Sequence, residues 1–161
     1  MIALPASNDA VLTVAIDPAL AILPSHMTSP EVKVLLLAIG RTETNFAARL
    51  QKDGPARGLW QFERNGVLAV MHHSASAQYV HDSIIKCGIP YGSTAIYTAL
   101  ADDDVLAAVL ARLLLWTDPL PLPPIGDIQA AWNYYTRNWR PGKPDPERWQ
   151  TAYDDALVTI A

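Results

Sequence analysis

Hydrophobic residues recur at helical spacing along most of this chain. A first apolar stretch runs from Asp9 to Leu23, and Pro18 is expected to break it. The segment Ser29-Pro30-Glu31 then supplies an N-cap, a proline for the first helical position and an acid for the first turn. The helix that it opens is predicted to run to about Leu50. Because Val, Ile and Thr follow the helical period rather than alternating, the pattern predicts a mainly α domain.

In the rest of the chain, helical segments alternate with segments that lack helical periodicity. Between Gln51 and Asn65 the helical period is lost, and Gly54, Pro55 and Gly58 predict a loop or a short irregular hairpin. The proline-rich segment from Asp118 to Gly126 predicts an extended connector. Further helices are predicted over five segments: Ser76–Cys87, Ser93–Ala101, Asp102–Trp116, Asp127–Asn138 and Pro146–Ile160.

One acidic residue lies on the apolar side of its predicted helix. Glu43 lies on the same stripe of the long helix as Ile39 and Phe46, which are apolar. Burial in an apolar wall raises the pKa of a carboxyl group, and this is how a general acid stays protonated near neutral pH. The alternatives are that Glu43 pairs with a buried arginine such as Arg57, or that it lies at a frayed helix end.

Composition narrows the class of protein. The chain has 161 residues, of which 50% are hydrophobic and 17% charged, so a single packed domain over residues 1–161 is expected. A net charge of -4 argues against nucleic-acid binding, and one cysteine excludes an internal disulfide or a multi-cysteine metal site. We expect no metal and no other cofactor. The longest apolar runs are shorter than the about 20 residues that a membrane span requires, so no such span is expected.

The broken segment after Glu43 has the composition of a sugar-binding loop. Gly54 and Gly58 allow the backbone to approach a ligand closely. Trp60 and Phe62 offer aromatic surfaces, and the amide of Gln61 can both donate and accept hydrogen bonds.

Three short motifs in this region and beyond resemble those of the soluble lytic transglycosylases. They are Glu43-Thr44-Asn45-Phe46, Gly58-Leu59-Trp60-Gln61 and Ala130-Ala131-Trp132-Asn133. The family has Glu-Ser followed by an aromatic residue, then Gly-Leu-Met-Gln, then Ala-Tyr-Asn, in the same order and with similar spacing from Glu43 to Gln61. The resemblance covers about residues 29–144. It implies a lysozyme-like fold and cleavage of the glycan strands of bacterial peptidoglycan.

The resemblance also implies roles for individual residues. Glu43 corresponds to the single catalytic acid and base, which protonates the oxygen between MurNAc and GlcNAc. Trp60, Gln61, Trp132 and Asn133 correspond to residues that line the cleft and bind the sugars.

The residues that follow Asn133 could extend the wall of the cleft. They are Tyr134, Tyr135, Trp139 and Arg140, and their aromatic rings could stack on sugars. The alternative for all of them is ordinary packing in the core and at the helix end.

The reaction type depends on whether Glu43 has a second carboxylate beside it. A hydrolytic muramidase ordinarily needs two, and Glu63 or Asp53 is a candidate for the second. A lytic transglycosylase needs one, because a hydroxyl of the sugar itself attacks. Lys52 stands where several family members carry a serine. We expect the lyase, with the hydrolase as the alternative.

The partner is expected to be peptidoglycan, and other virion proteins are possible partners. The start of the chain lacks the basic residues of a secretory signal, which favours a protein of a phage virion or a phage lysis enzyme that acts on the bacterial wall. The rival from another class is a non-enzymatic structural or tail protein of a phage that retains the fold.

Overall fold

The computed structural model describes residues 1–161 and contains helices joined by loops, with no β-sheet. Two isolated antiparallel bridges, Leu50 with Arg57 and Arg57 with Phe62, form the only strand-like pairing. The mainly α prediction is therefore confirmed, and the segment after the long helix is an irregular hairpin. The helices are α1 (Asn8–Val11), α2 (Asp17–Ile22), α3 (Pro30–Thr44), α4 (Arg64–His72), α5 (Ala77–Lys86), α6 (Ser93–Ala99), α7 (Asp104–Trp116), α8 (Ile128–Trp139) and α9 (Pro146–Ile160).

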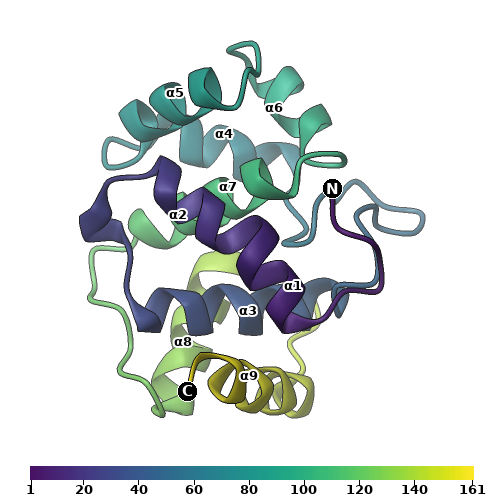
Figure 1. Ribbon diagram of the computed structural model, residues 1–161, viewed down its shortest axis with the longest axis vertical. Coiled ribbons are helices and arrows are strands. Elements are labelled where there is room, and N and C mark those ends of the chain that lie inside the picture. The colour runs from purple at the N-terminus through teal and green to yellow at the C-terminus, as the bar shows by residue number, and fades with distance from the viewer.

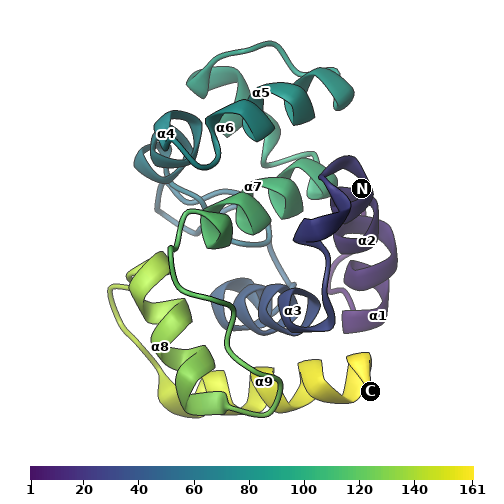
Figure 2. The same cartoon turned by 90° about the vertical axis from the view of Figure 1, so that its left-hand side faces the viewer.

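The helices are arranged in tiers around α7. In Figure 1, α4, α5 and α6 lie at one end of the molecule, and α3, α8 and α9 lie at the other. Helix α7 runs between these two groups, and Figure 2 shows α3, α8 and α9 together below it. Every residue from Leu106 to Leu113 is buried. The leucine-rich and alanine-rich sequence of α7 is typical of a helix that is buried on all sides. Its one buried arginine, Arg112, donates from Nε to the carbonyl of Met27.

Local capping signals explain where several helices begin. The side chains of Ser29, Asp103, Asp127 and Asp145 each accept a hydrogen bond from a backbone N–H in the first turn of α3, α7, α8 and α9, respectively. These contacts satisfy donors that have no partner within the helix. The predicted starts of α3 and α9 agree with the structure.

Pro18 does not break the first helix. The chain is helical from α1 to α2 through a short π-helix, Leu12–Ile16, in which the N–H of Asp17 donates to the carbonyl of Leu12. The wider π-turn lies directly before Pro18, where a proline ring would otherwise meet the preceding helical turn. The prediction of a break was wrong because a change of helical pitch replaces it.

The long helix α3 ends earlier than predicted, at Thr44 rather than near Leu50. Asn45 and Phe46 adopt left-handed backbone conformations with φ values of 52° and 49°, and these terminate the helix. A second difference is α4, which occupies residues for which the sequence pattern predicted no helix. No helix of the structure combines the length and the apolar character that crossing a membrane requires.

Candidate active site

The end of α3 places Glu43 beside the hairpin. Phe46 is fully buried, and its ring packs on Gly40 so closely that a Cβ atom at Gly40 would lie 2.2 Å from a ring carbon. Glycine one turn before the helix end therefore allows the chain to fold back over α3. Glu43 lies in the last turn of the helix, half-buried between these features.

Glu43 is held by a single hydrogen bond. The hydroxyl of Tyr135 on α8 donates to Oε1 of Glu43 at 2.7 Å. The other carboxyl oxygen, Oε2, makes no hydrogen bond within the protein and is not sealed from solvent. Burial raises the pKa of Glu43, while the Tyr135 hydroxyl and the charge of Arg148 partly oppose this rise. The carboxyl group therefore has one oxygen fixed and one free to contact a ligand.

Aromatic packing fixes the position of Tyr135. Its ring stacks on Trp149 of α9 with the centroids 4.8 Å apart and the planes at 2°. Trp132 and Trp139 of α8 lie on the same side of the helix, with centroids 5.8 and 6.5 Å from that of Tyr135. Burial and the neighbouring Glu43 raise the pKa of the Tyr135 hydroxyl, so it stays protonated and acts as a donor.

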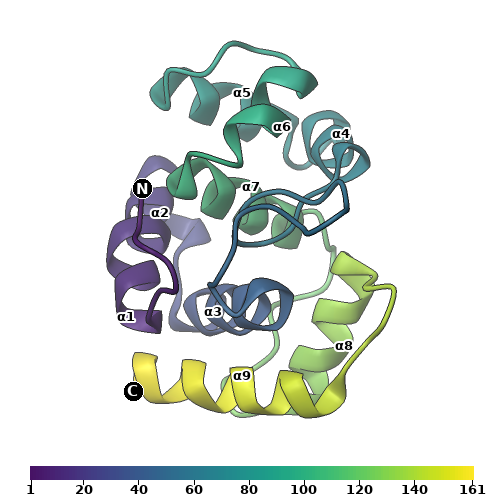
Figure 3. The same ribbon diagram turned by 90° about the vertical axis from the view of Figure 1, so that its right-hand side faces the viewer.

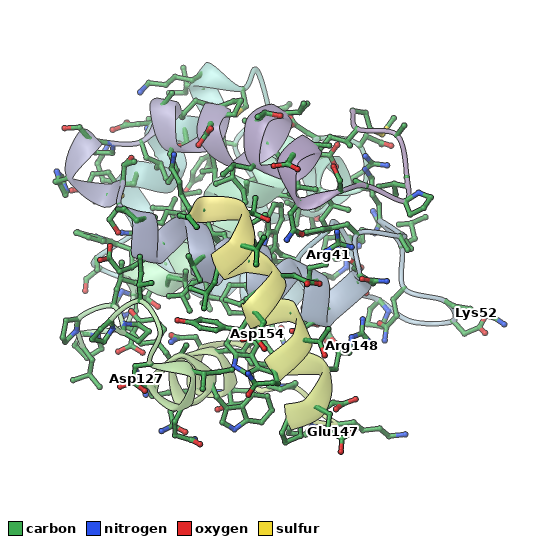
Figure 4. All side chains as sticks on the ribbon, turned by 60° about the horizontal axis from the view of Figure 1, so that its bottom comes forward. Arg41, Lys52, Asp127, Glu147, Arg148 and Asp154 are labelled. Atoms are coloured by element: carbon green, nitrogen blue, oxygen red, sulfur yellow. The ribbon has the colours of Figure 1, made fainter.

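Arg148 is the one charged group whose field acts noticeably on the pKa of Glu43. It lies in the first turns of α9, and its Nη2 donates to the backbone carbonyl of Arg41 on α3 at 3.3 Å. Figure 4 shows both arginines on the side of the molecule where α9 lies over α3. Arg57, proposed from the sequence as a partner, does not pair with Glu43, because its guanidinium lies over the ring of Tyr97.

The hairpin is tied directly to the residue after Glu43. The hydroxyl of Thr44 donates to the carbonyl of Leu59 at 2.9 Å. Gly58 is the turn residue, with a φ of 75°, and a Cβ atom there would lie 3.0 Å from the carbonyl oxygen of Leu100. Gln61 also has a positive φ of 54°, and its side-chain N–H donates to the carbonyl of Gly58 at 2.9 Å. The structure therefore brings the first two motifs together, with Gln61 half-buried and its amide oxygen free.

Three residues predicted to bind substrate have other positions. Trp60 is completely buried, and its indole N–H donates to the carbonyl of Leu36. Tyr134 is 4% exposed, and its hydroxyl donates to the carbonyl of Leu115 on α7. Both belong to the core, which corrects the expectation that they line a cleft.

Asn133 is the third of these residues. It is exposed and accepts a hydrogen bond from Gln129 at 3.1 Å, two residues before Tyr135 and thus on the far side of α8. Of the third motif, only Trp132 lies beside the aromatic ring that holds Glu43.

The acidic residues of the loop and Lys52 are exposed. Glu63 is the N-cap residue of α4, and Asp53 and Lys52 lie near the tip of the hairpin. Figure 4 shows Lys52 projecting from the rest of the molecule. No carboxylate acts noticeably on the pKa of Glu43. No group of three or more His, Cys, Asp or Glu residues in the structure is arranged to hold a metal ion.

Sequence reasoning did not single out the two groups that contact or act on Glu43. Tyr135 was only one of several residues expected in a cleft wall, and Arg148 carried no signal at all. Helical periodicity could have placed Tyr135, Trp132 and Trp139 on one face of α8, but not opposite α3. The position of Arg148 depends on how α9 packs, which no local pattern reveals.

The chain was compared with protein-family models, curated proteins and solved structures, and none of them matches it. The geometry of the site is therefore what indicates its chemistry. That geometry is a half-buried carboxyl group with a raised pKa, one donor on one oxygen, and a polar loop beside it.

Proposed function

We propose that this protein is a peptidoglycan lytic transglycosylase in which Glu43 is the general acid and base. The proposal rests on one observation. The carboxyl group of Glu43 is half-buried, its pKa is raised by burial, and one of its oxygens is held by the Tyr135 hydroxyl. The motif resemblance gives the substrate, the glycan strand between MurNAc and GlcNAc, and a lysozyme-like fold is part of the same proposal.

The environment of Glu43 suits a group that first gives and then takes a proton. A raised pKa increases the protonated fraction near neutral pH, so Oε2 can donate to the glycosidic oxygen. Once ionised, the carboxylate keeps the hydrogen bond from Tyr135 and feels the positive charge of Arg148. These two groups stabilise the carboxylate, which can then accept a proton in the next step.

Neither candidate for a second carboxylate acts on Glu43, which favours the lyase over the hydrolase. A hydrolytic muramidase uses a second carboxylate as nucleophile or base. Glu63 and Asp53 are exposed, and neither contributes to the pKa of Glu43. In the lyase reaction, Glu43 first gives its proton to the glycosidic oxygen as the bond from that oxygen to C1 of MurNAc breaks. The ionised Glu43 then accepts the proton of the C6 hydroxyl of MurNAc as the hydroxyl oxygen bonds to C1, so a 1,6-anhydro ring forms without water.

The test is clearing of purified peptidoglycan in a gel by the wild type and by Glu43→Gln. Glutamine keeps the size of the side chain but cannot act as an acid, so activity should fall by about 100-fold or more. Circular dichroism of the variant should match that of the wild type. Equal clearing by both proteins would remove Glu43 from the mechanism. No clearing by either would support the structural phage protein as the better explanation.

Mass spectrometry of the released muropeptides separates the two reactions. The lyase gives anhydro products, whereas the hydrolase gives products heavier by one water molecule. Hydrated products would overturn the lyase, and in that case Glu63→Gln should also be nearly inactive.

A further inference from the structure

Tyr97 on α6 carries two arginine side chains on its ring. The guanidinium carbon of Arg57, from the hairpin, lies 4.3 Å from the ring centroid. That of Arg64, from the first position of α4, lies 4.4 Å from the same centroid. The ring is fixed, because Tyr97 is 4% exposed and its hydroxyl donates to the carbonyl of Pro55. Figure 3 shows α4 and α6 close to the loop that leads out of α3.

Neither arginine has an anionic partner. Arg49 and Arg137 each form a salt bridge, with Asp104 and Asp118, but Arg57 and Arg64 form none and their side chains make no hydrogen bond. Glu63 precedes Arg64 directly and is exposed, yet it does not pair with it. Two uncompensated cations on one ring are unexpected in a chain whose net charge is -4.

The pair of arginines is linked to the candidate active site through short contacts. Arg57 and Phe62 pair through both backbone N–H groups at 2.9 Å. The Phe62 ring meets Trp139 edge-to-face at 6.0 Å between centroids, and Trp139 neighbours Tyr135, which holds Glu43. Gln61 lies between Arg57 and the aromatic cluster along the chain. The arginine pair and Glu43 therefore lie at the two ends of one series of direct contacts that begins in the hairpin.

We propose that Arg57 and Arg64 bind carboxylates of the acidic peptide that is attached to the glycan strand. This inference rests on the proposed function, because peptidoglycan carries such peptides on its muramoyl residues. Stacking on Tyr97 orients each guanidinium while leaving N–H groups at its edge to donate to a carboxylate in pairs. The arginines would thus select peptide-bearing strands over bare or neutral ones.

Binding can be measured without catalysis by using Glu43→Gln as the parent protein. The probes are peptidoglycan sacculi freed of phosphate-bearing polymers, and the same sacculi after their carboxyl groups have been converted to methylamides. The parent should bind the amidated sacculi about tenfold more weakly, since one charge-assisted hydrogen bond contributes about this much. Adding Arg57→Gln and Arg64→Gln should make binding to the two preparations equally weak.

Matched variants separate recognition from folding. Lys143→Gln removes one positive charge from an exposed loop and should retain the preference of the parent. Arg57→Lys with Arg64→Lys keeps both charges and should retain part of it. If the double glutamine variant is unfolded by circular dichroism, Arg64→Gln alone carries the test, because Arg64 is exposed.

Two results would overturn the inference. One is an unchanged preference for carboxylates in the folded glutamine variants, and the other is equal binding of both preparations by the parent. Because the readout is binding, a wild type that fails to cleave peptidoglycan would disprove the proposed function and leave this result standing.

Discussion

At the scale of single residues, Glu43 is subject to opposing influences of different origin. Burial raises its pKa most strongly, while the Tyr135 hydroxyl and the Arg148 charge lower it. Burial alone would leave too little of the ionised form to act as base, and the positive charge alone would leave too little of the protonated form to act as acid. The combination leaves both protonation states within reach, as a group that acts first as acid and then as base requires.

The effect of Arg148 predicts a shift in pH dependence. Arg148→Gln removes a positive charge that favours the carboxylate, so the pKa of Glu43 should rise further. The general acid then stays protonated to higher pH, and the alkaline limb of the profile of kcat/KM should move to higher pH. Because Arg148 is exposed, the shift should become smaller at high salt.

The control for this prediction is Lys143→Gln, which removes an exposed charge elsewhere on the surface. It should leave the alkaline limb where it is in the wild type. An alkaline limb that moves to lower pH in Arg148→Gln would contradict the proposed role of Glu43 as the acid, whereas one that does not move would show that Arg148 has no influence on it.

At the scale of elements, the sequence predicts well where local chemistry decides. Helices α8 and α9 begin at aspartate caps, and α3 begins at Ser29 before a proline; all three were predicted to within one residue. These signals lie within a few residues of the feature that they determine. No contact from a distant segment is needed to recognise them.

The sequence fails where packing between segments decides. The left-handed residues that end α3 are stabilised by Phe46, which packs on Gly40 and meets Trp60 edge-to-face. A continuous helical pattern across Asn45 gave no sign of this. Helix α4 begins at Arg64, and the side chain of its N-cap residue, Glu63, makes no capping hydrogen bond, so the start of this helix carries no local signal.

The hairpin has no room for a side chain at Gly58, which predicts the effect of a substitution there. Gly58→Ala places a side chain at a φ of 75° and 3.0 Å from the carbonyl oxygen of Leu100. Strain of this kind costs about 1–3 kcal/mol, so the melting temperature should fall and clearing of peptidoglycan should weaken as the loop that carries Gln61 shifts. Gly142→Ala is the matched control, because a Cβ atom there meets nothing within 4 Å. Equal stability of the two variants would show that the hairpin tolerates a side chain at residue 58.

At the scale of the whole molecule, the candidate site is assembled from segments far apart in the sequence. Glu43 could be singled out because it follows an apolar helical stretch and lies one turn after Ile39, on the same side of the helix. Tyr135 and Arg148 could not, because they reach Glu43 only through the packing of α8 and α9 against α3. The same limit explains why Trp60 was expected at the surface, since composition does not distinguish a sugar-binding indole from a buried one.

Long-range contacts of another kind tie the N-terminal segment to the central helix α7. Asp104, at the start of α7, accepts hydrogen bonds from the backbone N–H of Ile2 at 2.8 Å and from Nε of Arg49 at 2.7 Å. Arg49 also donates to the carbonyl of Ile2. This network joins the N-terminal segment and the chain after α3 to the central helix, and both of its charged side chains are largely buried.

Removal of one partner from this network should destabilise the whole domain. Asp104→Asn leaves the buried Arg49 without a counter-charge, which costs about 3–5 kcal/mol. That is a large part of the about 5–15 kcal/mol by which a domain is stable, and urea denaturation should show a lower midpoint with an unchanged slope. Arg49→Gln in the Asp104→Asn background should add much less than it does alone, because both changes remove the same contact. Additive effects would show that the two side chains act independently, and that the hydrogen bond to Ile2 rather than the ion pair holds the segments together.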